Sequence, residues 1–265
     1  MTTGQLPKFK KPPVVEVALS VQFERLPTTI QLALSWEKFR DRFPSIQEHP
    51  ELESTVERFG VVAPPTIQFS VNPISAPRLW FVNADNSDLI QVQRDRFIRN
   101  WRKTNDGSDY PSYENLRVAF EDDWKVFEQF ISDNGCQLHP NQCELTYVNI
   151  IEQVDLGQMD QIFKFLEPAK TSILENPEDL NFNVRYRMNN GDGQPVGRLH
   201  VSAHSAVRVP DNDLGIRFTL TARGAPAERN LAGAQQFLDQ AHEAIVKSFA
   251  ELTTDSMHKT WERTQ

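Results

Sequence analysis

Two stretches of this 265-residue chain carry the same order of predicted elements, and this internal repeat limits the fold more than any single motif does. Each stretch begins with a strand, at residues 14–24 and 143–151. Each continues through a short amphipathic helix and several strands, and each ends on a long amphipathic helix, at residues 116–131 and 231–252. The repeat therefore predicts the architecture of the protein, but it does not predict a chemistry.

The hydrophobic periodicity supports each of these elements. Apolar residues at every second position predict a strand with one buried face; in the first strand they are Val15, Val17, Leu19, Val21 and Phe23. Apolar residues three and four apart predict the first long helix; they are Leu116, Phe120, Trp124, Phe127 and Ile131. An almost unbroken apolar stripe, with Asn230 as the expected N-cap, predicts the second long helix.

Shorter elements are expected between them. In the first half we expect a helix capped by Ser35 and strands at 66–72, 78–83, 89–93 and 96–101, with a tight turn at Arg94 and Asp95. The second half has the corresponding short helix at 159–166, and its expected strands are 182–188, 199–203 and 216–222.

This order predicts an α+β protein with helices on one face of curved antiparallel sheets. Residues 1–136 form the first predicted repeat and residues 137–265 the second, within one integrated domain. The element order resembles the TATA-binding-protein-like or helix-grip folds. Folds of that kind host DNA binding, ligand binding and catalysis, so the resemblance does not select a function.

Composition points to a soluble, cytoplasmic protein. The chain is 39% hydrophobic and 24% charged, and no apolar run approaches the roughly 20 residues that cross a membrane. The first residues lack the apolar core of a signal peptide. Cys136 and Cys143 follow no metal or disulfide pattern, so we expect small packed side chains. A net charge of -8 opposes binding to nucleic acid or anionic lipid.

Four segments of the chain form a recognisable set: PPVVEVALSVQF at 12–23, LIQVQRDRFIRNWRK at 89–103, YPSYE at 110–114 and LTYVNII at 145–151. Together they resemble a sporadically distributed family of bacterial proteins of about this size. The resemblance implies a bacterial cytosolic protein. The sporadic distribution of the family suggests an accessory or defence role. The resemblance supplies no catalytic residue, cofactor or partner.

The polar face of the second-half strands is the strongest candidate binding surface. Alternation places the following residues on it: Asn183, Arg185, Arg187, Arg198, His200, Ser202, His204, Arg217, Thr219, Thr221 and Arg223. This set contains five arginines and no acidic residue. Clustered guanidinium groups are suited to binding a phosphate or carboxylate group. The alternative is a solvated face whose arginines pair with acids from the other half or from a partner subunit.

The hairpin at 89–103 is a weaker candidate. Its Arg96, Arg99 and Trp101 mix basic and aromatic character, which is typical of surfaces that contact nucleic acid. The alternative is that Phe97 and Trp101 are core residues. Asn149 interrupts an apolar strand face, and we interpret it as a structural amide at a bulge or between the halves.

No pattern predicts a catalytic or metal site. His200 and His204 lie two steps apart on either side of Ser202, about 13 Å from each other by strand rise, which is too far to share one metal. The chain has no nucleophile elbow, P-loop or dinucleotide-binding glycine pattern, so no cofactor is expected.

The leading hypothesis is therefore a non-catalytic binding module that uses the arginine-bearing face for an anionic ligand, a nucleic-acid backbone or an acidic protein. One alternative is an enzyme acting on an anionic small molecule, with His200 or His204 as acid/base and the arginines as clamps. The other is a structural component of a bacterial accessory or defence system that forms a homodimer through the polar face, since exposed antiparallel sheets can pair.

Overall fold

The computed structural model describes residues 5–24, 27–60, 76–104, 109–152, 154–167, 173–174, 177–208 and 213–265. The strand expected at 66–72 lies outside these residues. The described strands are β1 (Val14–Phe23), β2 (Ser45–His49), β3 (Arg78–Val82), β4 (Asp88–Gln93), β5 (Arg96–Arg102), β6 (Pro140–Glu152), β7 (Asn181–Asn189), β8 (Pro195–Arg208) and β9 (Asp213–Gly224). The helices are α1 (Thr29–Ser35), α2 (Tyr113–Asp133), α3 (Leu231–Leu252) and α4 (Asp255–Thr260), with 3₁₀ turns η1 (Trp36–Lys38) and η2 (Leu156–Gln161).

The strands form one antiparallel sheet in the order β2-β3-β4-β5-β1-β6-β9-β8-β7. β1 and β6, the first strands of the two halves, lie side by side at the middle of the sheet. Each carries the strands of its own half on its other side, β5 to β2 beside β1 and β9 to β7 beside β6. The two halves therefore meet in the central strand pair and share one continuous sheet.

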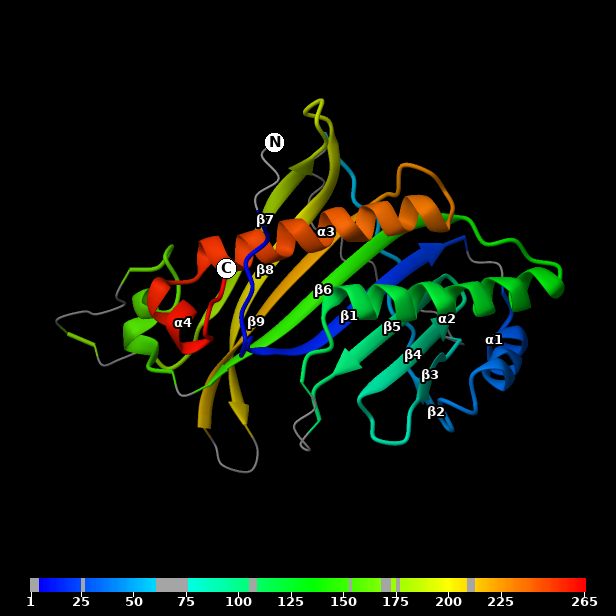
Figure 1. Cartoon of the computed structure of the whole chain (residues 1–265), viewed down its shortest axis with the longest axis horizontal. Coiled ribbons are helices and arrows are strands. Elements are labelled where there is room, and N and C mark those ends of the chain that lie inside the picture. Colours follow the sequence, from blue (N-terminus) through cyan, green and yellow to red (C-terminus); the bar gives the residue numbers. More distant parts are fainter. Residues whose placement is uncertain are drawn as a thin grey trace.

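Helices α2 and α3 lie on the same face of this sheet, α2 over the first half and α3 over the second (Figure 1). We call this the helix face and the opposite side the open face. The expected stripe of α2 is buried, and Trp124 packs against Phe23 and Phe97 with ring centroids 6.0 and 5.7 Å apart. The prediction of an α+β fold with helices on one face of an antiparallel sheet is thus confirmed.

Local capping explains where the predicted boundaries were right and wrong. Asn230 caps α3 as predicted, and its side chain accepts from the Gly233 N–H at 2.9 Å. Ser35 does not cap a helix: it is the last residue of α1, and its hydroxyl donates to the Leu32 carbonyl. An α-helix forms entirely before the expected one, because Thr28 and Gln31 form a capping box that begins α1. The helix expected after Ser35 is replaced by the 3₁₀ turn η1.

The second short helix also differs from the prediction. A 3₁₀ segment capped by Asp155 replaces the helix expected at 159–166. The apolar residues Met159, Ile162 and Phe163 of the expected helix are nevertheless buried, so these members of the hydrophobic stripe were correctly identified although the helix was not. β2 and α4 were not predicted; β2 is largely exposed, which leaves little hydrophobic pattern to detect.

Candidate ligand cavity and the arginine-bearing face

A segment without regular structure, residues 51–60, crosses the open face. Backbone N–H groups of Leu52, Thr55 and Glu57 donate to three glutamine side chains at 3.0, 3.2 and 3.0 Å. The accepting residues, on β4, β1 and β6 respectively, are Gln93, Gln22 and Gln142. The crossing segment therefore runs across the strands and brings first-half residues over the second half.

The crossing segment places Glu57 against the arginine-bearing face. Its carboxylate accepts from Arg198 and from His200 Nε2, the latter at 2.6 Å, and lies 3.6 Å from Arg223 Nη1. Burial raises the pKa of Glu57, but the hydrogen bonds from His200 and Arg198 outweigh burial and bring the pKa to about 2. Arg223 also pairs with Glu144 of β6. An acid from the other half thus neutralises part of this face, as the alternative interpretation expected.

The remaining arginines of this face are exposed. Arg185, Arg187 and Arg217 have no ion-pair partner among the residues that the structure describes, and His204 is half-buried next to Arg217 in the strand register. The arginine-bearing face therefore divides into an internally paired part around Glu57 and a free part along β7 and β9.

The candidates from the 89–103 hairpin lie in buried positions. Trp101 and Phe97 are 4% and 0% exposed on the helix face, so core burial, the alternative interpretation, is correct for both. Arg99 is also on the helix face, where it donates to Asp88 and Asp123 at 2.7 and 2.9 Å. Arg96 lies under the crossing segment and donates to Gln22 and the Glu53 carbonyl at 2.8 and 3.0 Å. These contacts support the fold.

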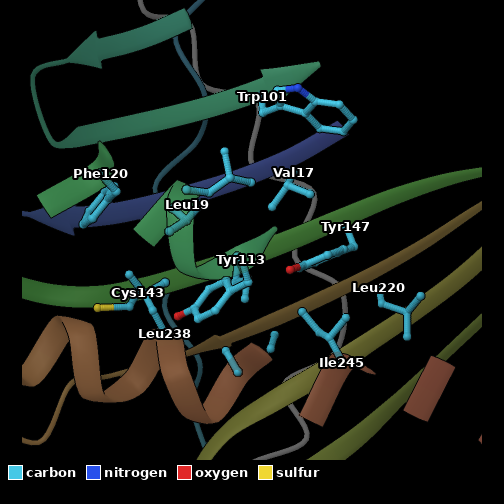
Figure 2. Close-up of a cluster of buried hydrophobic side chains, with 14 of the residues drawn as sticks. Val17, Leu19, Trp101, Tyr113, Phe120, Cys143, Tyr147, Leu220, Leu238 and Ile245 are labelled. Atoms are coloured by element: carbon cyan, nitrogen blue, oxygen red, sulfur yellow. The ribbon is translucent and has the colours of Figure 1, made fainter. Parts of the chain in front are cut away.

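A cavity of about 340 Å³ lies on the helix face, where the two halves and the N-terminal residues meet. Its walls come from residues 6–12, the start of α2, β6, β9 and α3. The mostly apolar lining includes Phe9, Pro12, Val14, Leu220, Ile245, Val246 and Phe249. In Figure 2, Tyr147 projects from β6 into the layer between sheet and helices, near Leu220 and Ile245.

A hydrogen-bonded chain of three side chains lies in the wall of this cavity. The Tyr110 and Tyr147 hydroxyls are 2.8 Å apart, and the Tyr147 hydroxyl is 3.1 Å from His242 Nδ1. Tyr113 stacks on the His242 ring with centroids 4.0 Å apart and donates its hydroxyl to Asp239 at 2.8 Å. Stacking and hydrogen bonding together hold the imidazole in one orientation.

The hydrogen-bonded chain of Tyr110, Tyr147 and His242 is uncharged at neutral pH. Burial lowers the pKa of His242 to about 4, because the carboxylates of Glu114 and Asp239 only partly offset the lost hydration of the imidazolium. Burial likewise raises the pKa of Tyr110 and Tyr147 above the ordinary tyrosine value. Each member can therefore both donate and accept a hydrogen bond.

Asn149 links the cavity to the sheet. It is 4% exposed, lies beside the irregularity in β1–β6 pairing, and donates from Nδ2 to the Phe218 carbonyl at 3.0 Å. The prediction of a structural amide at a bulge is confirmed. The same side chain also lines the cavity, a second role that the sequence did not indicate.

The backbone is strained at the cavity edge. Ser112, the N-cap of α2, has φ 79° and ψ 155°, a region occupied mainly by glycine. Its hydroxyl oxygen accepts from the Asn115 N–H, and Asn115 Nδ2 donates to the Pro111 carbonyl at 2.6 Å. These contacts hold residues 110–113 in the conformation that directs Tyr110 toward Tyr147 of β6 and Tyr113 toward His242 of α3.

Sequence reasoning missed this cavity because its residues are scattered from the N-terminus to α3. Only two signals pointed to it: the polar Tyr147 and Asn149 on an apolar strand face, and His242 near the apolar stripe of α3. Cys143 is buried and Cys136 half-buried, both as free thiols.

Over the described ranges, no three His, Cys, Asp or Glu side chains are grouped so as to hold a metal ion. No helix within those ranges has the length and apolar character needed to span a bilayer. Comparison of the chain with protein-family models, curated proteins and solved structures gave no match.

Proposed function

We propose that this protein is a non-catalytic binding protein that holds a small, largely apolar molecule in the cavity between the sheet and α3. The observation that carries the proposal is the uncharged Tyr110–Tyr147–His242 chain in the wall of an otherwise apolar cavity. Small-molecule sites typically combine apolar walls with a few convergent polar groups, and the cavity volume of about 340 Å³ is within their usual range.

The architecture fits this function. The two halves are interpreted as copies of one α+β unit, in an arrangement like that of the TATA-binding-protein-like or helix-grip folds. A long helix lying over a sheet leaves room for a ligand wherever the two layers separate. Here residues 6–12 contribute one wall of that space, and residues 8–11 are fixed by hydrogen bonds to residues 261–265.

Filling the cavity is expected to abolish binding. Val246→Trp places an indole at the cavity wall from a partly buried position on α3, whereas Val118→Trp makes the same change at an exposed position of α2. We expect the uncharged fluorophore N-phenyl-1-naphthylamine to bind the native protein saturably. Its affinity should fall at least tenfold in Val246→Trp and remain unchanged in Val118→Trp.

Thermal unfolding of both variants controls for folding. If Val246→Trp folds like the native protein and binds the fluorophore equally well, the cavity is not the site. If the native protein does not bind the fluorophore, and a second uncharged apolar fluorophore such as pyrene also fails, the proposed function is contradicted.

A second function is supported by the exposed arginines of the open face. Arg185, Arg187 and Arg217 lack an acidic partner within the described part of the chain, so this surface is suited to an anionic partner such as a nucleic-acid backbone or an acidic protein. The enzyme interpretation has less support, because His200 is bound to Glu57 and neither His200 nor His204 lines the cavity. A homodimer through this face would be detected by light scattering.

Charge reversal tests the anionic-partner function. In a mobility-shift titration with duplex DNA at low salt, Arg185→Glu combined with Arg217→Glu should weaken binding at least tenfold, and moderate salt should weaken native binding as well. Arg40→Glu with Arg229→Glu makes the same charge change at exposed residues that belong to no strand and should have a much smaller effect. Equal loss in both double variants would indicate a nonspecific charge effect.

A further inference from the structure

We infer that the cavity selects an uncharged molecule that carries a hydroxyl or carbonyl group on an apolar body. This inference rests on the proposed function and deepens it by naming the ligand class. It depends on three features of the cavity: the positions of the charged lining residues, the hydrogen-bond donors and acceptors of the Tyr110–Tyr147–His242 chain, and the Asn149 amide oxygen, which is unpaired within the described residues.

The charged groups of the lining lie at its edge. Lys8 and Glu114 are the charged lining residues, and both are exposed. Tyr147, deeper in the wall, is 7% exposed and has Tyr110 and His242 as neighbours, none of them ionised at neutral pH. A ligand carboxylate placed there would lose its hydration without gaining an opposite charge. For a ligand ammonium group, the carboxylates of Glu114 and Asp239 offset that loss only in part, as they do for the His242 imidazolium.

The hydrogen-bonded chain can be arranged in two directions. When His242 Nδ1 accepts from Tyr147, the Tyr147 oxygen accepts in turn from Tyr110. When Nδ1 carries the proton, it donates to Tyr147, Tyr147 donates to Tyr110, and the Tyr110 hydroxyl hydrogen becomes available to a ligand. The first arrangement leaves acceptor positions for a ligand hydroxyl, and the second supplies a donor for a ligand carbonyl.

Asn149 supplies a second polar contact. Its Nδ2 is fixed by the Phe218 carbonyl, which orients the amide, and its Oδ1 has no partner within the described residues. Because this buried side chain lines the cavity, Oδ1 can accept from a ligand hydroxyl. Much of the remaining lining is hydrocarbon, including Phe9, Leu220 and Ile245, which suits an apolar body.

A matched series of ligands tests the inference. Five naphthalenes with one skeleton would be compared as competitors of N-phenyl-1-naphthylamine at pH 7.5: naphthalene, 2-naphthol, 2-acetylnaphthalene, 2-naphthoate and 2-naphthylmethylammonium. The alcohol and the ketone should compete at concentrations at least tenfold lower than the carboxylate and the ammonium compound. They should also bind more tightly than naphthalene itself.

Removing one hydroxyl identifies the recognising group. Tyr110→Phe removes the hydroxyl that the hydrogen-bonded chain presents to a ligand, so it should bring the ketone to the affinity of naphthalene and weaken the alcohol, which keeps the Asn149 acceptor. The affinity for naphthalene itself should stay unchanged. Tyr186→Phe, at a 42% exposed tyrosine on β7, is the matched control and should change nothing. If Tyr110→Phe does not fold, Tyr147→Phe removes the neighbouring hydroxyl of the same hydrogen-bonded chain.

The outcomes separate this inference from the proposed function. Three results would overturn the ligand class. A charged naphthalene binds as tightly as the alcohol, or the alcohol binds no more tightly than naphthalene, or neither tyrosine variant changes the affinity for the alcohol. The ligand class is also overturned if a fluorophore binds in the cavity while no naphthalene displaces it. Failure of the proposed function has a different signature, namely apolar fluorophores that do not bind or whose binding does not respond to Val246→Trp.

Discussion

Asp123→Ala is expected to lower the free energy of unfolding by about 3–5 kcal/mol, because it deprives the buried Arg99 guanidinium of the more deeply buried of its two carboxylates. Asp123 is 0% exposed in α2, and it binds Arg99 of β5, whose side chain is 6% exposed, at 2.9 Å. The same carboxylate accepts from Arg42, which follows η1. One carboxylate therefore joins α2, the sheet and the segment before β2.

Asp122→Ala is the matched control, because the adjacent aspartate is exposed and its loss should cost less than about 0.5 kcal/mol. Urea unfolding followed by tryptophan fluorescence measures both variants, and Trp124 reports directly on the α2 contact. A loss below about 1 kcal/mol in Asp123→Ala would show that Asp88 alone compensates Arg99.

Acidification from pH 7 to pH 4 is expected to remove about 3 kcal/mol of stability through His242 alone. Its folded pKa of about 4 lies below the value of 6.5 for an exposed histidine. The unfolded chain therefore binds a proton that the folded protein excludes, so stability is fully present above pH 6.5 and decreases as pH falls toward 4. Burial lowers the pKa of His258 too, which adds to the loss in the same direction.

Glu57 acts in a separate window. Because its folded pKa of about 2 is below the ordinary value of 4.5, its contribution is present above pH 4.5 and is lost between pH 4.5 and 2. The His242→Gln variant should flatten the stability profile between pH 6.5 and 4 and leave the lower window unchanged. His139→Gln, at an exposed position, should keep the native profile. Identical profiles for His242→Gln and the native protein would contradict the assignment.

Much of the fold was predictable from local patterns. Apolar spacing predicts the two long helices and the central strands, and capping chemistry predicts Asn230 as the start of α3. Both signals come from residues only a few positions apart in the sequence. The errors occurred where two local signals competed. Ser35 has the chemistry of a cap, but the Thr28–Gln31 capping box satisfies more backbone donors about two turns earlier.

The candidate sites were less predictable. The strand alternation correctly identified the open face of β7 to β9, yet the sequence did not indicate that Glu57, more than 140 positions before Arg198 and His200, would lie against them. Arg99 shows the opposite error: it looked like a surface residue of a basic hairpin, but its strand parity directs it to the helix face, where Asp123 receives it.

The sequence by itself determined the repeated order of strands and helices and the side chains that each element buries, because hydrophobic periodicity acts over a few residues. Only the tertiary structure decided which distant groups meet. The crossing segment neutralised part of the arginine-bearing face, and the meeting of the N-terminal residues with α2, β6 and α3 made the cavity. Charge pairing and burial act between residues that are neighbours in space. The spacing of residues along the chain therefore does not predict these contacts.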